Sequence, residues 1–532
     1  MDAYRSSSLD AKWPSVALLR GTVLATLIAF ACGVAASTYS VFGHTWDEPE
    51  HLAAGLKMLA SGEYPYDVQH PPLARLAIAL GPYIDGARPY GNAGPSGEQE
   101  GRDILYRSGH YDEYLRLARL GTLPFFAALL VVTWLWARRL VGESYALLAV
   151  LFVVTTPPLL GHAALATLDV PMAAMTMLAL YLLTRWLDAP SVARATAFGV
   201  AAGLAAGTKL SAIPFVACTT LVWIIAQRLR PATASTGFVA PNAALVVRHG
   251  ISALLLAALT LIACYGSLSV PVGAARLVDS LTALHAHNVE GHWSYLFGEQ
   301  RRTGWWYFYV VVLGVKTPLP LLILGLAGIG LMLWRGWHQR RWDVAAPALA
   351  FLAVLIFSSA YSHINIGVRH VIVLFPVLAL AAAYALSLVW QRFKHPMARG
   401  ALALLLAWQV VGLVRAHPDD LAYFNELAGA HPERIVIDSD LDWGQDLRRV
   451  EEELAKRNIS EVSVLYRGTA DLSQERLPHW QRLPPKRRVT GWIAVSVLAK
   501  NTAERPADFA WLDTLQPVAR IGKSFYLYFV PN

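Results

Sequence analysis

The stretch ALLRGTVLATLIAFACGVAASTY, residues 17–39, indicates what kind of protein this is. It carries a single charge, Arg20, and exceeds the roughly 20 residues that a helix needs to cross a bilayer. It has no clear small-residue cleavage site, and further apolar runs follow it. We therefore interpret it as a retained first membrane span rather than a signal peptide.

The rest of the chain continues this pattern. Of its 532 residues, 55% are hydrophobic and only 15% are charged, and the mean hydropathy is +0.40. Soluble domains carry about 25% charged residues. The fold class we predict is a polytopic α-helical membrane protein of about eleven spans. We place the spans near 17–39, 120–137, 145–160, 169–187, 195–208, 212–227, 249–270, 306–334, 345–360, 370–390 and 400–415.

Arginine and lysine gather in alternate short loops, which is typical of cytoplasmic loops. The net charge of +8 therefore reflects membrane topology and does not indicate nucleic-acid binding. With the N-terminus inside, an odd number of spans places the C-terminus outside. The residues predicted to lie inside are Arg138, Arg139, Arg185, Arg194, Arg228, Arg230, Arg248, Arg335, Arg340, Arg341, Arg392, Lys394 and Arg399.

Three long segments then fall on the outer face, namely 40–118, 271–305 and everything after 416. We predict a membrane domain over 1–415 and a soluble outer domain over 416–532, where the composition becomes that of ordinary soluble sequence. A helix is predicted over 446–458, which suggests a small α/β domain. The predicted strands are IVIDSD (435–440), VSVLYRG (462–468), WIAVSV (492–497) and FYLYFV (525–530).

The first outer loop begins with HTWDEPEHLAAG, residues 44–55. Asp47 is predicted to cap a helix, with Pro49 at an early position and Glu50 completing an acidic capping box. A second helix is predicted from Leu73 to Leu80. Both have an apolar face at helical spacing, so we expect them to lie in the membrane interface with that face down.

Carboxylates stand at two predicted outer span ends, Asp47-Glu48 after the first span and Asp169 at the start of the fourth. Each is open to a simple interpretation as a helix cap. A carboxylate at the depth where a span ends is costly, however, and marks a functional site by default. A shared acidic cavity is the sharper hypothesis.

Cations occur at the same predicted level. Lys209 lies between two apolar stretches, Lys316 lies inside one, and Arg369 with His370 begins another. Any one lysine alone is more simply explained by snorkelling to the interface. Three separate cations facing two acidic sites indicate an anionic group such as phosphate.

The loop HAHNVEGHWSYLFGEQRRTGWW, residues 285–306, contains three histidines in its first eight residues. Zinc is conceivable, but the spacing matches no strong metal pattern, and sugar or lipid contact is the favoured interpretation. Cys32, Cys218 and Cys264 all lie in apolar segments, so no disulfide framework is implied. We expect no cofactor and no essential metal.

Several of these features together resemble the type-C membrane glycosyltransferases. They are the DE pair, the His-Pro-Pro helix start at 70–72, the Asp in the next outer loop and GLAAGTK at 203–209. The similarity is to the branch of protein O-mannosyltransferases and aminoarabinose transferases. Three segments look like bacterial members that depend on a lipid carrier: GHWSYLFGE (291–299), WWYFYVVVLGVKTPLP (305–320) and DSDLDWGQDL (438–447). The C-terminal domain differs from the β-trefoil inserts of eukaryotic mannosyltransferases.

The resemblance implies Asp47 as catalytic base, Glu48 as its partner and Asp169 as a second acidic residue. It implies a sugar donor on polyisoprenyl phosphate, inverting single displacement without a nucleotide sugar, and a protein, glycolipid or glycan acceptor. It also implies a bacterial inner membrane with the site and C-terminal domain outside. We predict donor binding by Lys209, Lys316, Arg369, His370, His70, Arg75, His292 and Tyr295.

Two other classes of function explain fewer of these features. A lipid-linked sugar transporter or flippase also needs charges beside a membrane cavity, but such folds often show two related halves. Here one long first loop and a trailing outer domain make the chain lopsided, which favours the transferase. A scaffold with an outer binding module leaves the clustered carboxylates and lysines unexplained.

Overall fold

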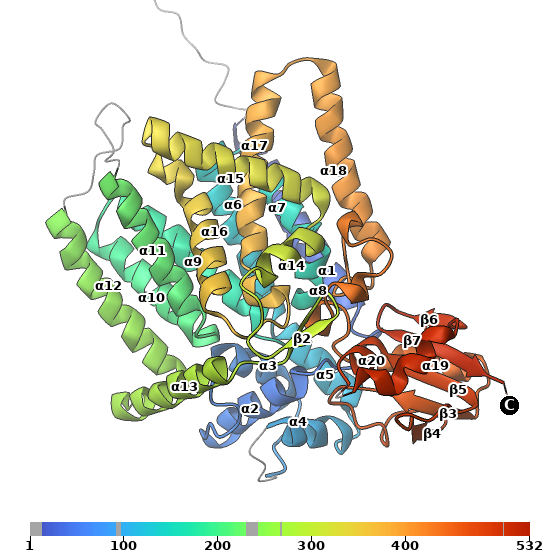
Figure 1. The fold of residues 1–532 in the computed structure, drawn as a ribbon. Coiled ribbons are helices and arrows are strands. Elements are labelled where there is room, and N and C mark those ends of the chain that lie inside the picture. Colours follow the sequence, from blue (N-terminus) through green and yellow to red (C-terminus); the bar gives the residue numbers. More distant parts are fainter. Residues whose placement is uncertain (1–12, 92–96, 230–242, 267–268, 504, 532) are drawn as a thin grey trace, which may run out of the picture.

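The computed structural model describes residues 13–91, 97–229, 243–266, 269–503 and 505–531. Among these residues, nine helices are long and apolar enough to cross a membrane, and a bent pair would be a tenth. The predicted fold class is confirmed (Figure 1). Of the residues predicted to lie inside, Arg230 is outside the described ranges. The helices at predicted spans are α1 (Trp13–Ser37), α6 (Leu123–Val141), α7 (Ala146–Val154), α8 (Pro157–Ala163), α9 (Asp169–Asp188), α10 (Val192–Thr208), α11 (Ala212–Leu229), α12 (Ala243–Cys264), α15 (Leu319–Gln339), α16 (Trp342–Tyr361), α17 (Leu374–Arg392) and α18 (Pro396–Ala416).

Two predicted spans differ from single straight helices because prolines interrupt them. The span at 145–160 is the α7–α8 pair, bent by 70° where Thr156 takes an extended conformation before Pro157. The span at 306–334 is two helices, α14 (Phe308–Lys316) and α15, separated at Pro318. The predicted span at 195–208 corresponds to α10, which is shorter than the nine long helices.

Four helices of the first outer loop pack together beside the membrane bundle: α2 (Glu48–Ser61), α3 (Leu73–Ile84), α4 (Gly97–Tyr106) and α5 (Tyr111–Leu120). Leu52 and Leu56 of α2 are buried in a core shared with α3, α4 and α5. The apolar face of α2 is thus covered by protein. The expectation that it lies on the membrane interface is wrong for that helix, because the loop supplies enough apolar surface to form a core of its own.

The C-terminal part begins after α18 with turns and then forms a sheet. The five strands have the order β4-β3-β5-β7-β6, with parallel pairing of β3 to β4 and β5 and antiparallel pairing of β7 to β5 and β6. The helices α19 (Leu447–Lys456) and α20 (Val497–Asn501) accompany the sheet. The strand bounds are β3 (Glu461–Leu465), β4 (His479–Arg482), β5 (Gly491–Ser496), β6 (Ala519–Ile521) and β7 (Phe525–Val530).

Three predicted strands and the predicted helix of this region are present, but IVIDSD (435–440) is not a strand. Short 3-10 turns occupy Pro432–Arg434 and Asp438–Asp440 instead. The reason is tertiary: the Asp440 carboxylate accepts hydrogen bonds from the Val368 N–H, and its carbonyl accepts one from Lys316. The segment is therefore folded against the membrane helices rather than paired in the sheet.

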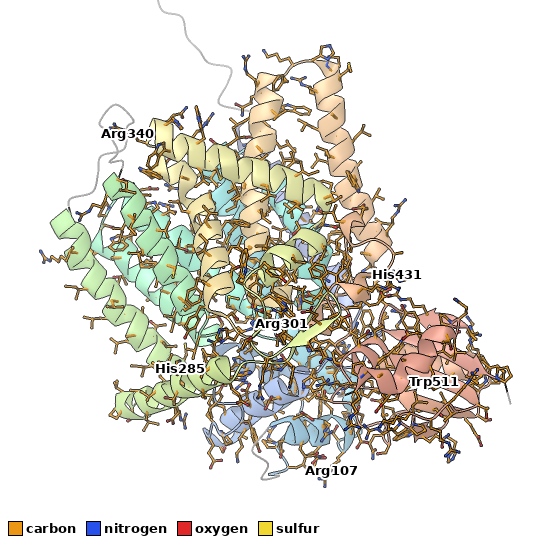
Figure 2. The ribbon with its side chains drawn as sticks, viewed as in Figure 1. Arg107, His285, Arg301, Arg340, His431 and Trp511 are labelled. Atoms are coloured by element: carbon orange, nitrogen blue, oxygen red, sulfur yellow. The ribbon has the colours of Figure 1, made fainter. Side chains whose placement is uncertain are left out.

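The two ends of the bundle differ in what they carry. Figure 1 shows the first-loop helices and the C-terminal sheet side by side at one end, with α13 (Val270–Glu290) crossing near them. In Figure 2, Arg107 and His285 lie at this end, whereas Arg340, predicted to be inside, lies at the other end. All three segments predicted to be outside contribute to the same end of the molecule.

Candidate active site

A cavity of about 670 Å³ lies where the first loop, α13, α16 and the turn at Val368–Val371 meet. Part of its wall is apolar, with Phe215 and Phe357 from the membrane helices and Leu284 from α13. The volume suits a small-molecule site. Its carboxylate, cationic and imidazole lining residues are Asp47, Glu50, His51, Asp67, His70, Lys209, His285, His287, His292, Arg369 and His370.

Asp47 occupies the position before α2, as predicted, but it does not cap the helix. Within the described stretch 13–91, no N–H of α2 donates to its side chain. Its Oδ2 instead accepts a hydrogen bond from Nη1 of Arg369 at 2.5 Å, while Glu50 accepts one from the Gly97 N–H. The predicted capping box is wrong, since a guanidinium in reach is a stronger partner than a backbone N–H. The Asp47 side chain is 26% exposed and lines the cavity.

Glu48 points the other way. Its Oε1 accepts hydrogen bonds from Arg119 Nε and the Ala166 N–H, both at 2.8 Å, and its Oε2 accepts from the Thr45 N–H at 2.7 Å. The side chain is 1% exposed, and it is not among the cavity-lining residues. Burial alone would raise the pKa of Glu48, but Arg119 overcomes that effect and lowers it. Glu48 is thus a permanent anion that ties the start of α2 to α5 and the 164–168 segment.

Asp169, Lys209 and Arg369 complete a chain of charges with Asp47. Lys209 Nζ lies 2.7 Å from Asp169 Oδ1, and Arg369 Nη1 lies 3.8 Å from Asp169 Oδ2. Arg369 therefore bridges the carboxylates of Asp47 and Asp169 at the polar wall of the cavity. Lys209 stands there because α10 ends at Thr208 and its backbone turns extended. The structure brings together these four predicted residues from four separate segments.

Lys316 is in a different place from the one predicted. Its side chain is fully buried, and Nζ donates to the carbonyls of Leu421 at 2.8 Å and Asp440 at 2.6 Å. Arg75 and Tyr295 are also directed into protein contacts rather than the cavity. Arg75 pairs with Asp67, and the Tyr295 hydroxyl donates to the Glu433 carbonyl at 3.0 Å. These three residues support the walls of the site instead of lining it.

Histidines form much of the remaining polar wall. Burial lowers the pKa of His70 to about 3, and it also lowers the pKa of His51, His287 and His292. These imidazoles are neutral near pH 7, so each offers one hydrogen-bond donor and one acceptor. Among the described residues, no group of three or more His, Cys, Asp or Glu side chains is arranged to hold a metal ion. The wall suits hydroxyl groups.

Sequence reasoning overlooked several residues of the site. His51 and Glu50 follow Asp47 by four and three residues, and helical spacing places them beside it on α2. That spacing was a usable signal. Asp67 and His287 reach the cavity only through the packing of distant segments, so no local pattern indicates them.

The chain resembles known proteins in part of its sequence and in its fold. Residues 51–266 match the family model described as dolichyl-phosphate-mannose-protein mannosyltransferase. The chain resembles ArnT from Cupriavidus metallidurans bound to undecaprenyl phosphate, with 15% identity, a TM-score of 0.51, and coverage of 95% of this chain and 98% of that one. It resembles the apo state of the same protein at 16% identity, with the same coverage and a TM-score of 0.51. No curated protein sequence matches the chain.

The chain has an ArnT-like fold, and its residues 51–266 resemble the protein mannosyltransferase family. Both findings agree with the resemblance that the motifs indicate. The family match begins within α2, ends just after α12 and contains His51, Asp169 and Lys209, whereas Asp47 and Glu50 lie directly before it. Arg369 and the DSDLDWGQDL segment lie beyond it.

Proposed function

We propose that this protein is a type-C membrane glycosyltransferase that moves a sugar, mannose or another hexose or pentose, from a polyisoprenyl-phosphate carrier to a hydroxyl or amine of its acceptor. The observation that carries the proposal is the pairing of Asp47 with Arg369 at the polar wall of a cavity whose other wall is apolar. A lipid-linked donor needs both kinds of wall, one for its phosphate sugar and one for its isoprenyl chain.

The chemistry assigned to these residues balances without a further reactant. The acceptor oxygen or nitrogen forms a bond to the anomeric carbon as the bond from that carbon to the phosphate oxygen breaks, and the electron pair leaves on the phosphate. Asp47 takes the acceptor proton as general base. Arg369 and Lys209 stabilise the departing phosphate. One displacement of this kind inverts the anomeric centre.

The ion pairs suggest how substrate binding activates the base. In the structure, Arg369 contacts Asp47, and Lys209 contacts Asp169. A donor phosphate that takes over the Arg369 guanidinium releases the Asp47 carboxylate to accept a proton. Asp169 then remains as the counter-ion that holds Lys209 in place. Neutral histidines of the wall supply hydrogen bonds to sugar hydroxyls.

The test uses purified protein in lipid with polyprenyl-phosphate sugars. Wild-type protein is expected to release polyprenyl phosphate or transfer the sugar, and Asp47→Asn is expected to lower the rate by at least about 100-fold while keeping thermal stability. Asp85→Asn, at an exposed carboxylate after α3, is the matched control. Full activity of Asp47→Asn contradicts the base assignment. Movement of the lipid-linked sugar across vesicles without bond cleavage supports the transporter or flippase instead.

We further propose that the enzyme works without an essential metal and sits in a bacterial inner membrane, with its cavity and C-terminal domain toward the periplasm or exterior. Protein, glycolipid and glycan acceptors all fit this placement. Activity that survives a chelator is the expected result for the metal. The domain limits 1–415 and 416–532 remain our proposal, with the addition that residues 417–446 contact both parts.

A further inference from the structure

The segment DSDLDWGQD, residues 438–446, contacts both sides of the Asp47–Arg369 pair, although it belongs to the C-terminal part of the chain. On the Asp47 side the contact is through backbone. The Trp46 N–H donates to the Trp443 carbonyl, and the Gly43 N–H donates to the Gln445 carbonyl, both at 3.1 Å. The four residues that precede Asp47 are thereby fixed against the segment.

On the Arg369 side the contact is through a ring. The Arg369 guanidinium carbon lies 4.3 Å from the centre of the Trp443 ring, and Trp443 is 2% exposed. The Asp440 carboxylate accepts the Val368 N–H at 3.1 Å, which holds the turn that carries Arg369. A desolvated guanidinium over an indole face is a strong form of cation–π contact.

The segment is in turn anchored to the sheet domain. Asp442 Oδ2 accepts hydrogen bonds from Ser496 Oγ at 2.6 Å and the Leu498 N–H at 2.8 Å. Asp446 Oδ2 accepts one from Ser524 Oγ at 2.8 Å. All four of these side-chain oxygens are buried groups. Trp443 is therefore tied to the C-terminal domain through its neighbours Asp442 and Asp446, and its ring also packs against His162 of α8, with 6.0 Å between the ring centres.

We infer that Trp443 is a positioning residue of the transfer reaction, through which the C-terminal domain holds the Arg369 guanidinium beside Asp47. The inference rests on the proposed function. Among the described residues, Arg369 Nε has no hydrogen-bond partner, so Nη1 and the ring face carry its placement. When a donor phosphate replaces Asp47 at Nη1, the contact with the indole face remains.

Three variants test this inference: Trp443→Leu, Trp443→Phe and the control Trp492→Leu. Trp492 lies on β5 and packs against Phe529 in the sheet domain. We expect Trp443→Leu to lower kcat/KM for a polyprenyl-phosphate sugar by roughly ten- to thirtyfold. Trp443→Phe keeps an aromatic face and is expected to stay within about threefold. The control is expected to match wild type in kcat and KM.

A double variant separates positioning from structural support. If Trp443 acts through Arg369, adding Trp443→Leu to Arg369→Lys costs clearly less than Trp443→Leu costs alone. Full activity of Trp443→Leu, equal losses in the Leu and Phe variants, or additive losses in the double variant would overturn the inference. Wild-type protein that transfers no sugar contradicts the proposed function instead. In that case the affinity for polyprenyl phosphate tests the role of Trp443, because Trp443→Leu is expected to lower that affinity and Trp443→Phe is expected to leave it unchanged.

Discussion

At the scale of single residues, two neighbouring carboxylates have opposite environments. Asp47 faces the cavity and pairs with Arg369, whereas Glu48 is buried with Arg119. One step along a helix start rotates a side chain by about 100°, which is enough to separate a solvent-accessible base from an internal counter-ion. The DE pair therefore combines a chemical role proposed for its first member with a structural role for its second.

Replacing Glu48 by Gln is expected to destabilise the protein. The Arg119 side chain is 1% exposed and would be left as a buried charge without its anion. Loss of one partner of such a pair costs about 3–5 kcal/mol. Thermal unfolding in detergent measures this loss of stability. Asp47→Asn is the comparison, because in that variant Arg369 still has the Asp169 carboxylate nearby. Equal melting temperatures for the Glu48→Gln variant and wild type would show that the pair is dispensable.

Glu50 gives a pH dependence whose sign follows from its surroundings. Burial and the Asp67 carboxylate raise the pKa of Glu50 from 4.5 to about 7, against the opposing effects of Arg75 and the Gly97 N–H. Since the folded state favours the protonated form, the contribution of this group to stability falls as pH rises from about 4.5 to about 7.

The variant Glu50→Gln keeps the acceptor for Gly97 and removes the ionisation. Its stability relative to wild type is expected to increase between pH 5 and pH 8, by on the order of 1–2 kcal/mol. Melting temperatures of the two proteins at both pH values measure the change. A difference that is the same at pH 5 and pH 8 would mean that Glu50 titrates below this range.

At the scale of elements, the cavity depends on close contacts between the first-loop helices. A Cβ added at Gly55 on α2 would lie 2.1 Å from the Arg75 carbonyl on α3, and one added at Gly101 on α4 would lie 2.0 Å from the Pro49 carbonyl. Both contacts are too short for any side chain. The helix that follows Asp47 thus packs closely against α3 and α4 at two glycines.

Gly55→Ala is expected to force α2 away from α3 and to lower stability by about 1–3 kcal/mol. Because α2 carries Glu50 and His51 and directly follows Asp47, transfer activity should fall as well. Gly330→Ala on α15 is the control, since a Cβ there meets nothing within 4 Å. Thermal unfolding measures the loss of stability, and the transfer assay measures the loss of activity. An unchanged Gly55→Ala variant would contradict the proposed seating of α2.

At the scale of the whole molecule, the two ends of the membrane bundle carry different features. Figure 2 places Arg340 at one end and Arg107 at the other, where the first loop and the C-terminal sheet lie. Arg340, which is predicted to lie in a cytoplasmic loop, is therefore at the opposite end of the bundle from the first-loop helices.

Labelling of single cysteines tests this orientation. In a background with Cys32, Cys218 and Cys264 replaced by serine, a membrane-impermeant maleimide should label Arg107→Cys and His431→Cys in intact cells or right-side-out vesicles. Arg340→Cys should react only after the membrane is opened. Labelling of Arg340→Cys in sealed vesicles would reverse the proposed topology.

Much of this architecture follows from the sequence because the signals are local. Apolar length fixes the spans, since each helix must satisfy its own backbone in lipid. Runs of aromatic and β-branched residues predict strands such as FYLYFV, which matches β7 residue for residue. The position of charged residues near predicted outer span ends also points to Asp47, Asp169, Lys209 and Arg369.

Tertiary structure alone decided which charges share the cavity. Asp47 and Arg369 are 322 residues apart, and no periodicity connects them. Lys316 looked equivalent to Lys209, yet the 438–446 segment covers it, and its ammonium donates to two carbonyls. IVIDSD has the composition of a strand but instead supplies one of these two carbonyls, that of Asp440. Local patterns report how a segment meets water or lipid, whereas a site is made by partners that only the packed chain brings within hydrogen-bond distance.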